Sequence, residues 1–221
     1  MPRRKTKLWG LVSRQPRWGL TIQGWFGLLL AIACTFWLLL TRLEPFLAYS
    51  APVAAEILIT EGWITDEGIM GAMDEFERQP YELLITAGSN FGRGEYLSQY
   101  KDFAHLAEAT LVTLGFDPQK IQPIPTPLAK RDQTLTSALE VKKWLQSQNI
   151  TPKGINIYSH SLHSRRSWLT YKTVFAPEIP VGVIAHPAQT YDPQSWWASS
   201  VGFKGVVLES ISYLYVKLFL L

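Results

Sequence analysis

Cysteine is almost missing from this sequence, and charged residues are few. Among 221 residues the one cysteine is Cys34, so a disulfide framework, a cysteine-based zinc site and a thiol nucleophile outside that position are excluded. Charged residues make up 18% and apolar residues 47%. This composition excludes intrinsic disorder and collagen-like repeats. A domain without disulfides needs an apolar core, and about 170 residues are enough to supply one.

Acidic residues are nearly absent from the first 50 positions. That segment holds seven Lys and Arg residues and one acid, Glu44, whereas the remainder holds 14 basic and 17 acidic residues. The net charge of +3 therefore comes from the N-terminal segment. Because the rest of the sequence has no basic stripe, nucleic acid is not predicted as a partner.

One long apolar run predicts a membrane-spanning helix at residues 19–41. These 23 residues carry no charge, and as a helix they would be about 34 Å long, enough to cross a bilayer core. Six positive charges precede the run, so we expect a cytoplasmic basic tail at residues 1–18 and export of the rest. A cleaved signal peptide, with cleavage contexts at residues 48–50 and 53–55, is the alternative, but the run is too long for an ordinary signal-peptide core. A linker is predicted at residues 42–55.

The remainder, residues 56–221, predicts one α/β domain. Short apolar runs of strand type alternate with stretches of helical spacing, which favours a Rossmann-like, mainly parallel sheet flanked by helices. The predicted strands are residues 56–60, 81–86, 121–124, 154–158 and 181–185. A last apolar helix, residues 207–218, is expected to cover one face of the sheet, with membrane contact as the alternative. Trp196 and Trp197 are expected to pack under that helix, with the bilayer interface as the second interpretation.

Polar residues gather directly after the predicted strands. In an open parallel sheet, ligands bind beyond the carboxyl ends of the strands, so the loops there are expected to form one site. Histidine and carboxylate side chains can exchange protons near neutral pH. The candidate catalytic residues are His163, with Glu95 or Glu61 as its partner. A metal site built on the histidines is less favoured than hydrogen-bonded histidines, and no metal is predicted.

The same loops carry glycines and cations that suit an anion. Glycines let backbone amides approach an anionic group, and arginine matches phosphate oxygens with two parallel hydrogen bonds. Cations at a helix start oppose the helix dipole, which favours an anion beside them. The candidate ligand-binding residues are Gly88, Ser89, Gly92, Arg93, Arg131, Thr134, His160, Arg165 and Arg166. A flexible glycine loop and solvated surface arginines are the alternative interpretations.

Three short motifs, in order, resemble a known family. They are Thr86-Ala87-Gly88 with Glu95, Gln133-Thr134 with Ser137-Ala138, and His163-Ser164-Arg165-Arg166-Ser167. Together they are similar to the ElyC/SanA/YdcF family of bacterial envelope proteins, over about residues 56–190, and the N-terminal anchor matches its membrane-bound branch. The sequence departs from the family pattern at Gln133, Thr136 and Ser137, and at the turn Glu61-Gly62-Trp63.

The resemblance indicates the cellular process in which the protein takes part, and it does not indicate a particular chemical reaction. It implies a Rossmann-like domain on the periplasmic side of the bacterial inner membrane, with a role in envelope integrity, peptidoglycan assembly or lipid-carrier metabolism. We expect an anchored protein that binds a phosphorylated or nucleotide-like metabolite. A non-enzymatic scaffold for cell-wall proteins is the alternative, and a serine hydrolase using Ser159 or Ser161 is a weaker one. The sequence indicates no particular cofactor and no particular protein partner.

Overall fold

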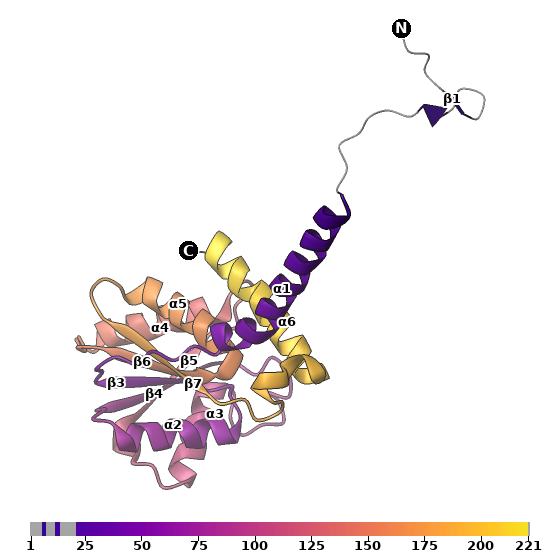
Figure 1. The fold of residues 1–221 in the computed structure, drawn as a ribbon. Helices are drawn as coiled ribbons and strands as arrows, with labels where there is room; N and C mark the ends of the chain where they lie inside the picture. The colour runs from indigo at the N-terminus through magenta and orange to yellow at the C-terminus, as the bar shows by residue number, and fades with distance from the viewer. Residues whose placement is uncertain (1–5, 8–11, 14–20, 221) are drawn as a thin grey trace. The chain divides into compact units, whose positions relative to one another are not determined.

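The computed structural model describes residues 6–7, 12–13 and 21–220, and the chain forms two compact units (Figure 1). The first unit ends at Leu39 and the second begins at Leu40. In the first, two short strands, β1 (Thr6–Lys7) and β2 (Val12–Ser13), pair antiparallel. Apart from these four residues, the predicted basic tail lies outside the described part of the chain, as does the start of the predicted span.

Helix α1 (Ile22–Leu47) covers residues 22–41 of the predicted span. It is the one helix among residues 21–220 that is long and apolar enough to cross a membrane. Residues 42–47, predicted as the start of a linker, instead continue this helix. Leu47 is fully buried and Glu44 nearly so, so the last turns of α1 gain packing partners within the second unit. This packing explains why the segment stays helical although Pro45 lies in it.

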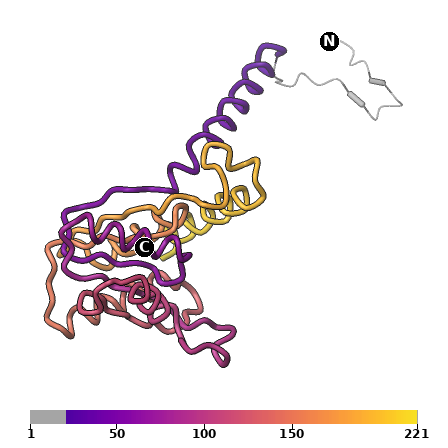
Figure 2. The backbone as a smooth tube through the Cα atoms, turned by 90° about the horizontal axis from the view of Figure 1, so that it is seen from below, coloured from indigo at the N-terminus to yellow at the C-terminus, as the bar shows by residue number. Residues whose placement is uncertain are grey.

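The segment that follows α1 is bound to an edge of the sheet. Ala51 and Val183 exchange two backbone hydrogen bonds of 2.8 and 3.2 Å. The Asn156 side chain accepts from the Val53 N–H at 2.9 Å and donates to the Val53 carbonyl at 2.8 Å. Figure 2 shows this segment as the indigo tube that runs from the end of α1 across the body. The rest of the predicted linker is therefore a fixed part of the second unit.

The core of the second unit is a five-stranded, all-parallel sheet, which confirms the predicted fold class. The strand order is β5-β4-β3-β6-β7, so the chain starts in the centre, moves to one edge and then returns to the other side of β3. The turning point between β3 and β6 is the place where such sheets bind ligands. The strands are β3 (Ile57–Glu61), β4 (Leu83–Ser89), β5 (Ile121–Thr126), β6 (Ile155–His160) and β7 (Val181–His186).

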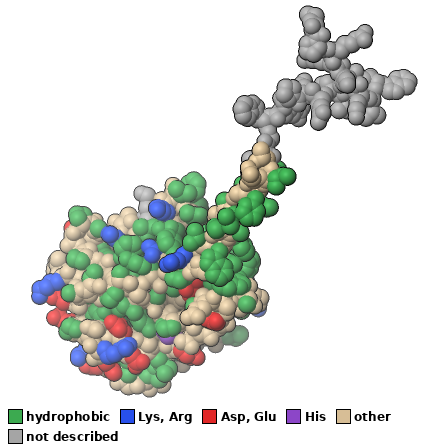
Figure 3. Space-filling model, viewed as in Figure 1, with side chains coloured by type: hydrophobic (Ala, Val, Ile, Leu, Met, Phe, Trp, Pro, Cys, Tyr) green, Lys and Arg blue, Asp and Glu red, His purple; other side chains and the backbone are tan. Residues whose placement is uncertain are grey.

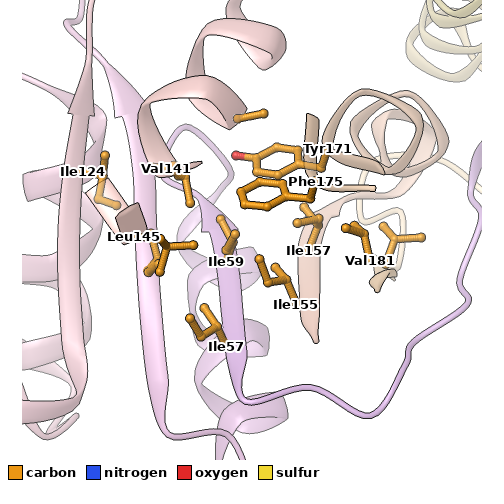
Figure 4. Packing of buried hydrophobic residues seen from close by; sticks show 14 residues of the cluster. Ile57, Ile59, Ile124, Val141, Leu145, Ile155, Ile157, Tyr171, Phe175 and Val181 are labelled. Atoms are coloured by element: carbon orange, nitrogen blue, oxygen red, sulfur yellow. The ribbon is translucent and has the colours of Figure 1, made fainter. Parts of the chain in front are cut away.

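Helices cover both faces of the sheet because neighbouring strand residues point to opposite sides. Ile57 and Ile59 pack with α4 (Gln133–Ser147) and α5 (Ser164–Phe175), as Figure 4 shows. Leu58, between them, belongs to the layer formed with α2 and α3. The helices of that layer are α2 (Asp66–Arg78) and α3 (Phe103–Thr113). The chain also forms the 3₁₀ turns η1 (Pro118–Lys120) and η2 (Ser161–His163).

The last helix, α6 (Ser200–Phe219), follows the 3₁₀ segment η3 (Pro193–Ala198). The prediction that it covers a face of the sheet is wrong, because it packs against α5, η2 and η3. Its Val206 lies in a small separate core with Leu47, Leu162 and Trp196. The predicted packing of Trp196 is confirmed: this side chain is buried, and its Nε1 donates to the Leu40 carbonyl at 2.8 Å.

Candidate functional site

A pocket of about 410 Å³ lies at the carboxyl ends of β3 and β4, beside the starts of α4 and α5. Gly88 makes this arrangement tight, because a Cβ there would lie 2.7 Å from the Ala104 backbone nitrogen. The absent side chain lets the start of α3 approach the end of β4. The lining residues are Glu61, Trp63, Ala87, Gly88, Ser89, Phe103, Arg131, Asp132, Gln133, Thr134, Ser137, His163 and Arg166.

Glu61, the last residue of β3, places a buried carboxylate at the floor of the pocket. It accepts hydrogen bonds from Ser159 Oγ at 2.5 Å and Ser167 Oγ at 2.8 Å. His163 Nε2 lies 3.4 Å from Glu61 Oε1. Burial alone would raise the pKa of Glu61, but His163 and the two hydroxyls outweigh burial and lower it. Glu61 is therefore held as a carboxylate, which makes it an acceptor and an orienting group.

His163 ends the turn η2 and lies between two carboxylates. Its Nε2 is 3.3 Å from Thr134 Oγ1 and faces Glu61. Its Nδ1 is 3.3 Å from Glu209 Oε1. Burial would lower the pKa of His163, but Glu61 and Glu209 outweigh burial and raise it to about 9. His163 thus favours the protonated imidazolium form at neutral pH, so it is placed to give a proton.

Arg166 competes with Glu209 for the same ring nitrogen. Its Nη2 lies 2.8 Å from His163 Nδ1, and a guanidinium can only donate, so this contact requires an Nδ1 without a proton. A hydrogen bond from Nδ1 to the Glu209 carboxylate requires instead that Nδ1 carries a proton. The two carboxylates decide the balance in favour of the protonated ring. The site therefore contains a donor and an acceptor that select different protonation states of His163.

Glu209 closes this network from the last helix. Arg166 Nε donates to Glu209 Oε1 at 2.5 Å, and Arg166 Nη1 lies 4.0 Å from Asp132 Oδ2. Burial would raise the pKa of Glu209, but His163 and Arg166 outweigh it and lower the pKa to about 2. Glu209 was not predicted from the sequence, although it is the only acid in the last helix.

The structure brings together seven of the residues predicted for the site. These are Glu61, Gly88, Ser89, Arg131, Thr134, His163 and Arg166. Five others do not line the pocket. The guanidinium of Arg165 stacks on the rings of Phe46 and Tyr49 at 4.0 and 4.1 Å. The ring of His160 lies beside that of Trp63. The other three belong to the turn region after β4: Gly92 and Arg93, which are exposed, and Glu95.

The two serines considered as nucleophiles are buried away from the pocket lining. Ser159 and Ser161 are nearly inaccessible, and Ser159 donates to Glu61 rather than to a histidine. This geometry does not supply the serine and histidine pair that a hydrolase uses. Within the described residues, no group of three or more His, Cys, Asp or Glu side chains is arranged to hold a metal ion.

Helix caps around the pocket differ in a way that favours an anion at α5. Asp102 caps α3 through the His105 N–H, and Asp132 caps α4 through the Leu135 N–H. Neither η2 nor α5 has a side-chain cap, and helix N-termini attract negative groups. Of the pocket residues, Arg131 and Arg166 add positive charge near these helix starts. The start of α5, where Arg166 lines the pocket, is therefore a candidate position for an anionic group.

Comparison of the sequence with protein-family models finds no match, and comparison with curated proteins finds none either. The site is accordingly interpreted from its own chemistry. It combines a buried acid–base network with an uncapped helix start, at the edge of the sheet where parallel α/β domains bind small molecules.

Proposed function

We propose that this chain is a membrane-anchored protein of the bacterial envelope that binds a phosphorylated or nucleotide-like metabolite in this pocket. The observation that carries the proposal is the uncapped start of α5 beside Arg131, Arg166 and His163. An anionic group there would interact favourably with the helix dipole and meet cationic donors. The resemblance to the ElyC/SanA/YdcF family supports a role in peptidoglycan or lipid-carrier metabolism.

His163 supplies the chemistry if the bound metabolite is transformed. Its imidazolium could give the Nε2 proton to a leaving group, and the neutral ring would then be held through the Nδ1 proton that faces Glu209. The ring would then regain a proton from solvent, because Glu61 and Glu209 favour the imidazolium form. His163 is the proposed general acid, with Glu61 and Glu209 as positioning residues.

The location of the domain is part of the proposal. Helix α1 could cross a membrane, and the cations that precede it favour an N-terminus in the cytoplasm and a domain outside it. Paired fusions of alkaline phosphatase and green fluorescent protein after residue 221 test this orientation. Phosphatase activity without fluorescence is expected, and the reverse pattern would contradict export.

Ligand binding is tested by thermal unfolding of the full-length protein in detergent. The probes are inorganic phosphate, nucleotides, nucleotide sugars and isoprenoid phosphates, and a ligand of the folded state raises the midpoint by mass action. Arg131→Ala is expected to weaken binding roughly tenfold or more, because one charge-assisted hydrogen bond contributes about 1.5–3 kcal/mol. Arg131 is exposed, so the change should leave the protein without ligand equally stable.

Lys130→Ala is the matched control, since Lys130 is an exposed neighbouring cation outside the pocket lining. Equal weakening by both changes would indicate a general charge effect and contradict the pocket. Stabilisation by none of the probes, from a cooperatively unfolding protein, would overturn the proposal.

A scaffold for cell-wall proteins is the second candidate, favoured by the exposed apolar side of α6. A scaffold would not need the pocket. Arg131→Ala and His163→Asn would then complement a deletion of the gene fully, whereas a metabolite-binding protein requires that at least one of them fails.

A further inference from the structure

Helix α6 is apolar on two opposite sides, and the second unit covers only one of them. Residues 202, 206, 209, 213 and 216, spaced by three or four, form its inner side. The opposite side is formed by residues 204, 208, 211, 215 and 218. Leu208, Ile211 and Leu218 of that outer side are 53%, 59% and 69% exposed. A helix on a water-facing surface normally carries polar residues there.

The exposed apolar surface continues beyond α6. Phe46, at the end of α1, is 40% exposed, and its ring meets Tyr213 of α6 edge-on at a centroid distance of 5.3 Å. Trp197, shortly before α6, is also part-exposed. Single exposed apolar residues are ordinary, but a continuous run of this extent indicates an interaction surface.

Along α6 and residues 40–49 the exposed charges have one sign. Along α6 and residues 40–49 the acids are Glu44 and Glu209, and both are engaged: Glu44 accepts from Tyr191, and Glu209 accepts from Arg166. The cations Arg42, Lys204 and Lys217 are exposed. Figure 3 shows Lys and Arg side chains between hydrophobic ones over this part of the molecule. Apolar side chains framed by cations match the acyl chains and anionic headgroups of a bilayer.

Chain continuity brings this surface to the bilayer. The uncharged part of α1 ends at Thr41, and Leu40 and Leu43 pack into the small core that includes Val206 and Tyr213 of α6. Trp196, just before α6, donates to the Leu40 carbonyl. The end of the span and the inner side of α6 therefore share one core, so α6 cannot be far from the lipid headgroups.

We propose that the outer side of α6 lies in the lipid headgroup region, as a second membrane contact beside the span. This inference rests on the proposed anchoring by α1. The occupant of the apolar surface is the bilayer itself, with Trp197 and Tyr215 at the level where amphipathic aromatic rings concentrate. The domain is then held at the membrane by two elements, the span and α6.

Site-directed spin labelling of the full-length chain tests the proposal. In a Cys34→Ala background, single cysteines replace Ile211, Leu214 or Leu218, all at exposed positions that leave the core unchanged. The protein is placed in nanodiscs of phosphatidylethanolamine and phosphatidylglycerol. Collisions with oxygen, which concentrates in lipid, are compared with collisions with a water-soluble nickel chelate. A several-fold higher oxygen-to-nickel ratio is expected on α6 than at the control Leu139→Cys.

Leu139 is an equally exposed leucine on α4, and a label at Leu29 of α1 reports the span. Lipid contact at Leu29 with water contact on α6 would overturn this inference and leave the anchoring intact. Water contact at Leu29 would overturn both. Spin–spin broadening on α6 that disappears on dilution with unlabelled protein would show a second copy on this surface, and would also overturn the proposal.

Discussion

Neutralising Glu209 is expected to lower the pKa of His163 towards neutral pH. The pKa of His163 is raised from 6.5 to about 9 by Glu61 and Glu209, against the effect of burial. This difference corresponds to about 3 kcal/mol, at about 1.4 kcal/mol for each pKa unit. Glu209→Gln removes one of the two carboxylates and is expected to lower the pKa of His163 by about 1–3 units, the usual effect of one nearby opposite charge.

The sign of the pH dependence follows from the raised pKa. A group whose folded pKa lies above its unfolded value stabilises the protein fully below the unfolded value, and this contribution is lost as the pH rises through the folded value. The wild-type midpoint of unfolding should therefore fall by about 6–12 °C between about pH 5.5 and about pH 10 on account of His163, at roughly 2–4 °C per kcal/mol. His163→Asn lacks the titrating group and gives the reference curve.

The direct assay is a titration of the imidazole resonances by nuclear magnetic resonance, on full-length protein in detergent. The chain has four histidines, and His163→Asn identifies the relevant resonance by its disappearance. A wild-type His163 that titrates at or below 6.5 would refute the reasoning, and would mean that donation from Arg166 to Nδ1 decides the state of the ring. An unchanged pKa in Glu209→Gln would refute the role of Glu209.

Two matched pairs test the packing of the second unit by thermal unfolding. Leu145, on the buried side of α4, lies in the core, so Leu145→Ala should lower the free energy of unfolding by about 2–5 kcal/mol. Leu139→Ala, on the exposed side of the same helix, should change it by less than about 0.5 kcal/mol. Equal effects would contradict the assigned core. Trp196→Phe removes the donor to the Leu40 carbonyl and should destabilise the protein by about 1–3 kcal/mol. The side chain of Trp197 is part-exposed, so Trp197→Phe should leave the stability unchanged. Loss of stability in the second tryptophan variant alone would reverse their assigned roles.

The elements of the sheet could be predicted because their signals are local. Each strand is a short apolar run, and each intervening helix has apolar residues at a spacing of three and four. The edge of the sheet that carries the site followed from topology, since the carboxyl ends of parallel strands meet at one edge. This is why Glu61, Gly88 and His163, far apart in the sequence, line one pocket.

The parts that could not be predicted depend on tertiary contacts. Arg165 and Arg166 look alike in the sequence, yet a helix turns about 100° from one residue to the next, and only Arg166 faces the pocket. Glu209 meets Arg166 through the packing of α6 on α5, which no local pattern encodes. Residues 42–47 stay helical because Leu47 finds a core to enter, although their composition resembles that of a linker.

The position of Glu209 in the chain has a consequence for biosynthesis. During translation all five strands leave the ribosome before α6 does, and the sheet with its pocket can start to form while Glu209 is still unsynthesised. A nascent domain at that stage would hold His163 beside a single carboxylate, with Arg166 lacking its strongest partner. The acid–base network is therefore completed by the last helix to emerge, so the site would mature only when α6 reaches its place on the folded domain.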